Sequence, residues 1–339
     1  MAERIAIVVP CRNEMRHIDA FLASALEQQL PEGSTLQVVV ADGASDDGTA
    51  ERLRETAARE PRLLVIDNPA RITSTGLNRA IMAAEADIVV RMDVHTSYAS
   101  DYVLQCVRTL HSTGAACVGG AWRPVGEGFP QRAIARAFQS RFGSGGAASR
   151  RAALDGPVDT VYLGAWWRSA LLSIGAFDES LARNQDDELA LRITRAGGVV
   201  WQSSSIRSWY VPRASFGALF QQFWQYGYWK LAVIRKHKAP ASLRHLVPVT
   251  FVALLLGLAL AGLAWPPSWW GLVGLLGVYT TAALVSAWPL AAGSIRDALG
   301  IAWAFACMHL GYGAGFARAL VDFVLLRRRP GAAATRLTR

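Results

Sequence analysis

Four clusters of polar side chains follow apolar runs of the sequence, and each contains residue types that can bind a ligand or move a proton. The first is Pro10-Cys11-Arg12-Asn13-Glu14, directly after the apolar run Ile5–Val9. A polar loop at the end of a strand can bind a nucleotide base or a ribose. The alternative is that Asn13 only caps the helix that follows. The candidate binding residues of this loop are Pro10, Arg12, Asn13 and Glu14.

The second cluster is Asp42-Gly43-Ala44-Ser45-Asp46-Asp47-Gly48-Thr49, which follows another apolar run. Asp42 leaves that run directly, so its carboxylate can accept a hydrogen bond from a uracil N–H or a sugar hydroxyl. Gly43 allows the backbone to turn close to a ligand. Asp46 or Asp47 is instead expected to cap the next helix. The loop has no Gly-x-Gly-x-x-Gly, which argues against dinucleotide binding.

The third cluster, Arg91-Met92-Asp93-Val94-His95, places a carboxylate and an imidazole two residues apart. Residues at this spacing on an extended chain point to the same side. Asp93 and His95 are therefore candidates for holding one divalent cation against a diphosphate. Their donor types suit Mn²⁺ well and Mg²⁺ acceptably. The alternative for His95 is an ordinary hydrogen-bonded loop histidine.

The fourth cluster is Asn184-Gln185-Asp186-Asp187-Glu188-Leu189, and an apolar-periodic segment follows it as far as Arg195. Carboxylates at a helix N-terminus are favoured by the helix dipole in any case. One of them can also serve as a general base, because an acceptor hydroxyl must lose its proton when it displaces a leaving group.

The segments around these clusters predict a scaffold that brings them together. Expected strands are Ile5–Val9, Leu36–Ala41, Leu63–Ile66 and Asp87–Met92, and expected helices are His17–Gln29, Asp46–Arg59 and Leu77–Glu85. Strands that alternate with helices indicate an α/β domain with a mostly parallel sheet, here over residues 1–204. Ligands bind at the carboxyl ends of such strands, so the polar clusters should meet at one edge of the sheet.

The distribution of charge separates this domain from the rest of the chain. The 339 residues carry a net charge of +9, but residues 1–204 hold 21 basic and 24 acidic side chains. Residues 205–245 hold 7 basic and no acidic ones, and residues 246–339 hold 7 and 2. Because the folded domain is mildly acidic, no nucleic-acid partner is expected.

The positive charge lies beside apolar segments, as it does where proteins meet anionic lipid headgroups. Leu246–Ile295 contains no charged residue and no His, and the prolines of Trp265–Trp269 interrupt it. Membrane lipids are therefore expected partners. The stretch 213–236 reads as one or two amphipathic helices on the membrane surface, with an ordinary core helix as the alternative. We expect a basic interface segment at 205–245, membrane segments at 246–265, 269–290 and 298–326, and a disordered tail at 330–339.

The topology of these segments leaves a choice open. The run Ile5–Val9 is too short for a signal peptide, and the four cysteines have no paired or metal-like spacing, which suits a cytoplasmic N-terminal domain. We expect a multi-pass protein of the cell (inner) membrane. Three crossings would put Arg327-Arg328-Arg329 outside, against the positive-inside rule. Either the rule is violated, or the third segment is re-entrant or interfacial. Small residues in that segment permit close helix packing, namely Gly311, Gly313 and Gly315.

As an ordered set, the clusters resemble the family 2 inverting glycosyltransferases with a GT-A fold, over about residues 4–230. Val8–Glu14 looks like the family's opening strand and loop, and Asp42–Asp46 like its nucleotide-binding acidic loop. Asp93-Val94-His95 is similar to its Asp-x-Asp metal motif, with His in place of the second Asp. Gln185-Asp186 is similar to its Glu-Asp pair, with Gln in place of Glu.

A closer similarity is to the succinoglycan-type exopolysaccharide glucosyltransferases, carried by segments such as Leu77-Asn78 and Gln225–Lys230. The resemblance implies a nucleotide-diphosphate sugar donor, UDP-linked, and Asp186 as the catalytic base. It implies that Asp93 and His95 hold Mn²⁺ or Mg²⁺. The donor-binding residues would be Pro10, Arg12, Asn13, Glu14, Asp42, Asn78, Arg91 and Asp93.

The acceptor implied by the resemblance is a lipid-linked saccharide. The residues expected to contact it or its diphosphate are Gln185, Asp187, Arg207, Arg213, Lys230 and Arg235, although the basic ones can equally touch lipid headgroups. The chain lacks the Gln-x-x-Arg-Trp motif of processive synthases, so one sugar per acceptor is expected, in exopolysaccharide or cell-envelope glycan synthesis.

Three alternatives remain open. The first is a polyprenyl-phosphate sugar transferase, which performs the same chemistry on a bare lipid phosphate. The second is a sugar-phosphate nucleotidyltransferase, which usually opens with a Gly-rich loop that this chain lacks. The third is a catalytically inactive membrane scaffold, for which His95 and Gln185 would be signs of decay.

Overall fold

The computed structural model describes residues 2–239, 242–328, 330–331 and 334. The chain divides into two compact units, Met1–Arg123 with Ala148–Tyr210, and Pro124–Ala147 with Val211–Arg339. Arg329 and most of the tail expected to be disordered, 330–339, lie outside the described residues. The four cysteines are buried and free.

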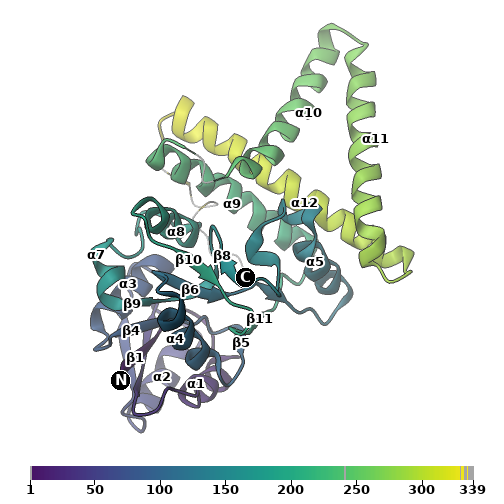
Figure 1. Ribbon diagram of the computed structural model, residues 1–339. Helices are drawn as coiled ribbons and strands as arrows, with labels where there is room; N and C mark the ends of the chain where they lie inside the picture. Colours follow the sequence, from purple (N-terminus) through teal and green to yellow (C-terminus); the bar gives the residue numbers. More distant parts are fainter. Residues whose placement is uncertain (1, 240–241, 329, 332–333, 335–339) are drawn as a thin grey trace. The chain divides into compact units, whose positions relative to one another are not determined.

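The first unit is built on an eight-stranded sheet with the order β3-β2-β1-β4-β9-β6-β10-β8 (Figure 1). Strands β1 to β4 pair in parallel, as do β6 and β10, whereas β9 runs antiparallel between β4 and β6. The predicted mostly parallel sheet is therefore confirmed. Its strands are β1 (Arg4–Cys11), β2 (Thr35–Asp42), β3 (Leu63–Asp67), β4 (Ile88–Arg91), β6 (Cys117–Gly120), β8 (Gly156–Pro157), β9 (Tyr162–Trp167) and β10 (Val200–Gln202).

Helices cover both faces of this sheet, which is why its central strands are apolar without interruption. Successive side chains of a strand point to opposite faces, so Ile5 and Ile7 pack with α1, α2 and α4, whereas Ala6 and Val8 pack with α3, α7 and α8. The helices are α1 (Ile18–Leu26), α2 (Thr49–Ala57), α3 (Thr73–Ala83), α4 (Tyr102–Thr113), α7 (Arg168–Ser173) and α8 (Gln185–Arg195), with a 3₁₀ turn at Ala148–Arg150. A small second sheet has the order β5-β11-β7, and its strands are β5 (Thr96–Tyr98), β11 (Ser208–Tyr210) and β7 (Arg123–Pro124).

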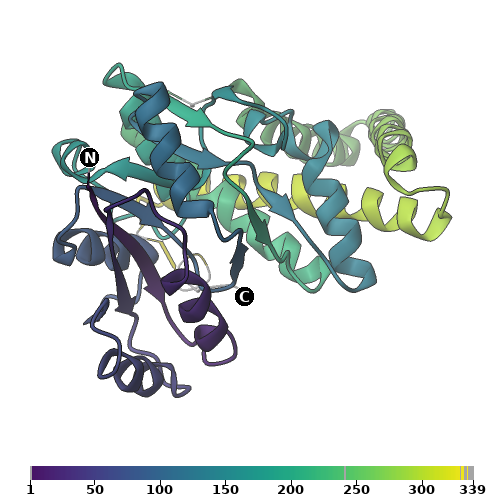
Figure 2. The same ribbon diagram turned by 60° about the horizontal axis from the view of Figure 1, so that its bottom comes forward.

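The second unit is helical, and its helix α12 runs beside α9 in both views (Figures 1 and 2). Glycines allow this close approach: a Cβ atom on Gly227 would lie 1.9 Å from Tyr312 O, and one on Gly315 would lie 1.9 Å from Trp224 O. The close packing predicted for this segment is thus confirmed. The helices are α5 (Phe129–Gln139), α6 (Arg141–Ser144), α9 (Phe216–His237), α10 (Val247–Ala264), α11 (Ser268–Ala287) and α12 (Ile295–Leu320). Short turns are Leu243–Leu246, Trp288–Leu290 and the π-helical Val321–Leu325.

The units divide the chain at other points than the expected boundary at residue 204. Residues 205–210 stay with the sheet because β11 pairs with β5. Residues 124–147 join the second unit because α5 and α6 pack on α12, where Arg136 forms an ion pair with Asp297 at 2.6 Å. The stretch 213–236 forms one helix, α9, and not two. Its buried polar residues, including Gln225 and Lys230, show that much of its surface contacts protein, as in the core-helix alternative.

Among the described residues of the second unit, three helices are long and apolar enough to cross a membrane, by length and composition alone. They are Leu243–Ala264, Ser268–Leu290 and Ile295–Leu325, close to the predicted segments. The first two are mostly exposed, whereas 61% of the apolar window of the third is buried by other parts of the structure.

Candidate active site

A buried arginine joins two of the predicted clusters at the carboxyl end of β4. Arg91 is the last residue of β4 and is 4% exposed. Its guanidinium donates to the two carboxylate oxygens of Asp93, at 3.1 and 3.2 Å, and forms an ion pair with Asp186 in the first turn of α8. The two carboxylates come from distant parts of the sequence, and Arg91 joins them through different nitrogens of its guanidinium, Nε and Nη2 for Asp93 and Nη1 for Asp186.

Burial and charge together set the protonation of this group. Loss of water around Asp186 raises its pKa to about 6; Arg91 opposes the rise, and Asp93 and Asp187 add to it. The Asp186 side chain is still 37% exposed, so a substrate can reach the carboxylate while water screens part of the shift. Burial opposes the charge of Arg91, but its pairing with Asp186 and Asp93 prevails and raises the pKa of Arg91.

Two tyrosines support the loop that carries Asp93. The Asp93 N–H donates to the Tyr98 hydroxyl at 2.7 Å, and this hydroxyl donates to Asp93 O at 3.1 Å. Burial raises the pKa of Tyr98 well above its ordinary value, so the hydroxyl keeps its proton and both bonds. Tyr162 of β9 shares a hydrogen bond with Thr96 at 2.8 Å. Sequence reasoning missed both tyrosines, because neither belongs to a polar cluster and Tyr162 is far away in sequence.

The pair expected to hold a metal, Asp93 and His95, makes separate contacts. Both oxygens of Asp93 bind Arg91, whereas His95 Nδ1 lies 3.5 Å from Glu14 Oε1. Among the residues that the structure describes, no three His, Cys, Asp or Glu side chains gather so that they could hold a metal ion. The donor types still fit Mn²⁺ or Mg²⁺, provided that further ligands come from a substrate and that the ion competes with Arg91 for Asp93.

The loops after β1 and β2 are tied together, as neighbouring parallel strands predict. The Asn13 side chain donates to Asp46 at 2.8 Å and accepts from the Asp46 N–H at 3.0 Å, so Asn13 does not cap α1. Asp42, paired in register with Cys11, accepts a hydrogen bond from the Ser45 hydroxyl at 2.6 Å. The predicted loops 10–14 and 42–49 are thus joined by hydrogen bonds at the carboxyl edge of the sheet.

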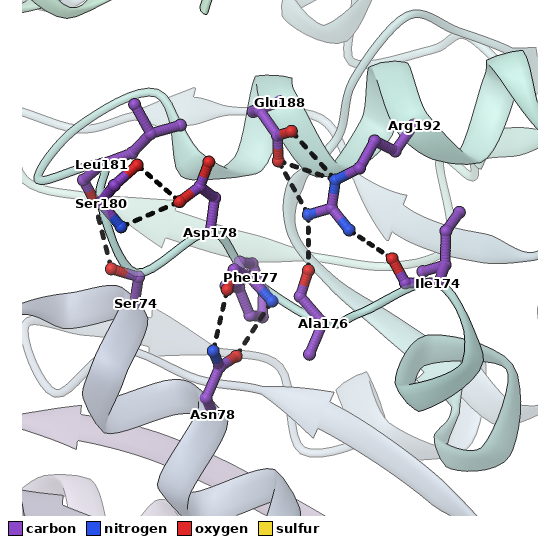
Figure 3. A network of polar contacts seen from close by, with 10 residues as sticks. All are labelled: Ser74, Asn78, Ile174, Ala176, Phe177, Asp178, Ser180, Leu181, Glu188 and Arg192. Atoms are coloured by element: carbon purple, nitrogen blue, oxygen red, sulfur yellow. Dashed lines mark hydrogen bonds and ion pairs between the residues drawn. The ribbon is translucent and has the colours of Figure 1, made fainter. Parts of the chain in front are cut away.

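The first turn of α8 presents the fourth cluster. Gln185 and Glu188 are buried, whereas Asp186 and Asp187 are half-buried. Glu188 is fully covered and is paired with Arg192 one turn later, which donates to its two oxygens at 2.7 to 3.0 Å (Figure 3). Glu188 is therefore part of the scaffold, and Asp186 is the carboxylate of this turn that meets another predicted cluster.

Asn78, one of the expected donor-binding residues, contacts the loop before α8. Its side chain donates to Phe177 O at 2.8 Å and accepts from the Phe177 N–H at 2.9 Å (Figure 3). It also donates to Glu179 Oε1 at 2.9 Å. Both donors of the amide are thus engaged by protein.

The residues expected to contact an acceptor fall in both units. Arg207 belongs to the first unit, is half exposed, and lies 3.5 Å from Asp101. Arg213, Lys230 and Arg235 belong to the second unit. Lys230 is buried on α9, and Arg235 donates to Phe323 O at 3.0 Å. Their role in acceptor binding stays a prediction.

Comparisons with known proteins show which family the chain resembles. The profile described as glycosyl transferase family 2 matches residues 6–171. The chain is 36% identical over 327 residues to the succinoglycan biosynthesis protein ExoA of Rhizobium meliloti (strain 1021), covering 95% of this chain and 96% of that protein. It is 25% identical over 267 residues to a dolichyl N-acetyl-alpha-D-glucosaminyl phosphate 3-beta-D-2,3-diacetamido-2,3-dideoxy-beta-D-glucuronosyltransferase of Methanococcus voltae, covering 76% and 82%.

A solved structure extends the likeness to the fold. The mannosyltransferase PcManGT of Pyrobaculum calidifontis, in complex with GDP-Man and Mn²⁺, matches with a TM-score of 0.62. The identity is 21%, and the match covers 94% of this chain and 88% of that one.

Proposed function

Because the chain belongs to glycosyl transferase family 2, we propose that it transfers one hexose from a UDP-linked donor to a lipid-linked saccharide, with inversion at the anomeric carbon. The observation that supports this proposal most strongly is the buried Arg91 between Asp93 and Asp186. A direct displacement needs a base on one face of the sugar and a site for the leaving diphosphate on the other, and Asp186 and Asp93 are the candidates for these two sites.

In the proposed mechanism, Asp186 accepts the proton of an acceptor hydroxyl. The oxygen attacks the anomeric carbon on the face opposite the leaving diphosphate, forms the new C–O bond and breaks the old one. A single displacement inverts the configuration, so an α-linked donor gives a β-linked product. The raised pKa of Asp186 suits this role, because a base works best when its pKa lies near the working pH.

The donor would be held along the carboxyl edge of the sheet. Asp42 and the loop 10–14 would bind uridine, and Asp93 with His95 would hold Mn²⁺ or Mg²⁺ on the diphosphate. When bound, such an ion neutralises the charge that develops on the leaving group. Arg91 would keep Asp93 oriented toward the donor side. The complex of PcManGT with GDP-Man and Mn²⁺ supports the expectation of a metal.

The relatives and the second unit support a lipid-linked acceptor. ExoA is named for succinoglycan biosynthesis, and the Methanococcus voltae protein for transfer to a dolichyl-linked sugar phosphate. The three apolar helices would keep the enzyme at the cell (inner) membrane, with the catalytic unit in the cytoplasm, where nucleotide sugars are available. Arg207, Arg213, Lys230 and Arg235 are the cations proposed to face the lipid diphosphate.

The proposal is tested with the full chain in detergent, incubated with UDP-glucose, UDP-galactose, UDP-N-acetylglucosamine or GDP-mannose and Mn²⁺. We expect one UDP-sugar to be hydrolysed, and hydrolysis to stop in a chelator and in Asp93→Ala. Activity that persists unchanged in the chelator would refute the metal role. If none of the donors is hydrolysed, the scaffold alternative gains support. With membrane lipid extract present, the mass of the glycolipid product separates a diphosphate-linked saccharide from a bare lipid phosphate.

A further inference from the structure

The loop that delivers Asp186 has no regular structure of its own. It covers residues 174–184, between the end of α7 at Ser173 and the start of α8 at Gln185. Its backbone is left-handed at Ala176, with a φ of 47°, and at Asn184, with a φ of 61°. Residues other than glycine adopt such backbone conformations only at a cost in free energy, so other contacts must hold the loop in place.

Helix α3 supplies the first set of such contacts (Figure 3). The amide of Asn78 meets the backbone of Phe177 with two hydrogen bonds, one in each direction, at 2.8 and 2.9 Å. The Ser74 hydroxyl, one turn earlier, donates to Leu181 O at 3.1 Å and is buried. Asn78 thus satisfies both the N–H and the C=O of Phe177 and binds this part of the loop to α3.

Helix α8 supplies the second set. Arg192 donates to Ile174 O at 2.6 Å and to Ala176 O at 2.5 Å, and Glu188 pairs with the same guanidinium. Glu188 is fully buried, and its ion pair with Arg192 fixes the orientation of the guanidinium. Arg192 therefore fastens the first residues of the loop to the same helix that carries Asp186.

We propose that Asn78 and Arg192 are positioning residues of the transfer reaction, which hold the loop 174–184 so that Asp186 reaches Arg91. This inference rests on the proposed function, in which Asp186 is the base. Neither residue needs to touch a substrate. A displacement of the base by about 1 Å can cost about 100-fold in rate, so the contacts should control kcat.

The proposal makes a different prediction for Asn78 from the donor-binding role expected from the resemblance. A residue that binds the donor changes KM or the dissociation constant of UDP when it is removed. A residue that positions the base changes kcat and leaves these constants nearly unchanged. The two roles are therefore separable by kinetics.

The first experiment compares Asn78→Ala and Arg192→Lys with wild type in Mn²⁺-dependent UDP-glucose hydrolysis. Lysine keeps a charge for Glu188 but cannot reach the two carbonyls as a fork. We expect kcat to fall about tenfold or more in each variant, with KM unchanged within about twofold. The matched control is Arg168→Lys, because Arg168 also donates to two backbone carbonyls, Ile81 O and Met82 O, away from the loop. Its kcat should stay near wild type. A raised KM with normal kcat would overturn the proposal.

The second experiment reads the loop directly and does not depend on activity. Trypsin can cut after Arg183, and mass spectrometry of the full chain in detergent reports the rate of that cut. Release of the loop in Asn78→Ala should speed cleavage after Arg183 by about tenfold, while other sites of the first unit are cut as in wild type. Equal cleavage at Arg183 in Asn78→Ala and wild type would overturn the proposal.

A double variant separates this inference from the proposed function. If Asn78 acts through Asp186, adding Asn78→Ala to Asp186→Asn should cause no further loss in single-turnover hydrolysis. A full multiplicative loss in the double variant would overturn the positioning role. Normal turnover by Asp186→Asn alone would instead refute the base assignment, whatever the trypsin result for the loop.

Discussion

At the scale of single residues, the site depends on one buried cation that serves two carboxylates. Arg91 is almost completely buried, and a buried charge is tolerated only when it is paired. Asp93 and Asp186 provide the pairing from two different loops. Each carboxylate thus keeps the arginine in place for the other, and a ligand that takes Asp93 away from Arg91 would leave the full positive charge to Asp186.

The raised pKa of Asp186 predicts the pH dependence of the reaction. The proposed base works only when deprotonated, so kcat should be constant at high pH and fall about tenfold per pH unit below the pKa of Asp186, which is about 6 while Arg91 is shared with Asp93. Mn²⁺ on Asp93 would leave Arg91 to Asp186 alone and so move this break toward lower pH. An ordinary aspartate, with a pKa of about 3.9, would lose activity only at much lower pH. The measurement is kcat for hydrolysis at saturating Mn²⁺ from pH 5 upward. The control is His95→Asp, which removes the nearby imidazole and keeps a metal-binding side chain, and a break that vanishes in this variant would contradict the assignment to Asp186.

Removal of the buried cation should affect both stability and rate. Arg91→Leu leaves the two carboxylates without their partner, and we expect a loss of about 3–5 kcal/mol in the free energy of unfolding, as for other broken buried pairs. Hydrolysis should fall with it. Arg4→Leu is the control, because the ion pair of Arg4 with Asp87 is exposed and screened by water, so its loss should hardly change the stability. Thermal unfolding in detergent compares the two variants. Equal unfolding midpoints would show that the buried pairing of Arg91 does not stabilise the fold.

At the scale of elements, the local pattern predicts the sheet better than the site. Apolar runs such as Ile5–Val9 are buried on both faces and can hardly form anything other than central strands. The first residue of a helix is harder to predict. The helix expected from Asp46 begins at Thr49, because Gly48 has a left-handed backbone and the Asp47 carboxylate accepts a hydrogen bond from the Thr49 N–H. Arg192 acts through the carbonyls of Ile174 and Ala176, and no spacing in the sequence reveals these contacts.

The packing of α9 on α12 is an element-scale feature with a direct test. A Cβ atom on Gly315 would lie 1.9 Å from Trp224 O, a backbone atom that cannot move without shifting the helix. Gly315→Ala should therefore cost about 1–3 kcal/mol and lower the unfolding temperature in detergent. Gly277→Ala on α11 is the matched control, since its Cβ would meet nothing within 4 Å. If both variants unfold alike, the close approach of the two helices is not what stabilises the second unit.

At the scale of the whole molecule, the sequence predicts an α/β part and an apolar helical part, but it does not predict which residues belong to each unit. Composition distinguishes a mildly acidic α/β part from an apolar, basic part. It does not show that residues 124–147 leave the first and join the second, because α5 looks like any amphipathic helix until its partner α12 is known. Asn78 shows the same limit within the site, since its role depends on Phe177, which is remote in sequence.

The second unit also bears on the open question of topology. Helices α10 and α11 expose their apolar side chains, whereas α12 is covered for much of its length by α9 and α5, which carry charges that hydrocarbon excludes. We therefore predict that α10 crosses the membrane, that α11 crosses back, and that α12 stays at the membrane interface. Arg327 then lies on the cytoplasmic side, as the positive-inside rule favours. Cysteines introduced one at a time in place of Arg59, Trp265 and Gly331 test this with an impermeant maleimide on oriented membrane vesicles, and the chain with its four buried native cysteines alone is the blank. We expect positions 59 and 331 to be labelled from one side and position 265 from the other; labelling of 331 from the side opposite to 59 would show that α12 crosses as well.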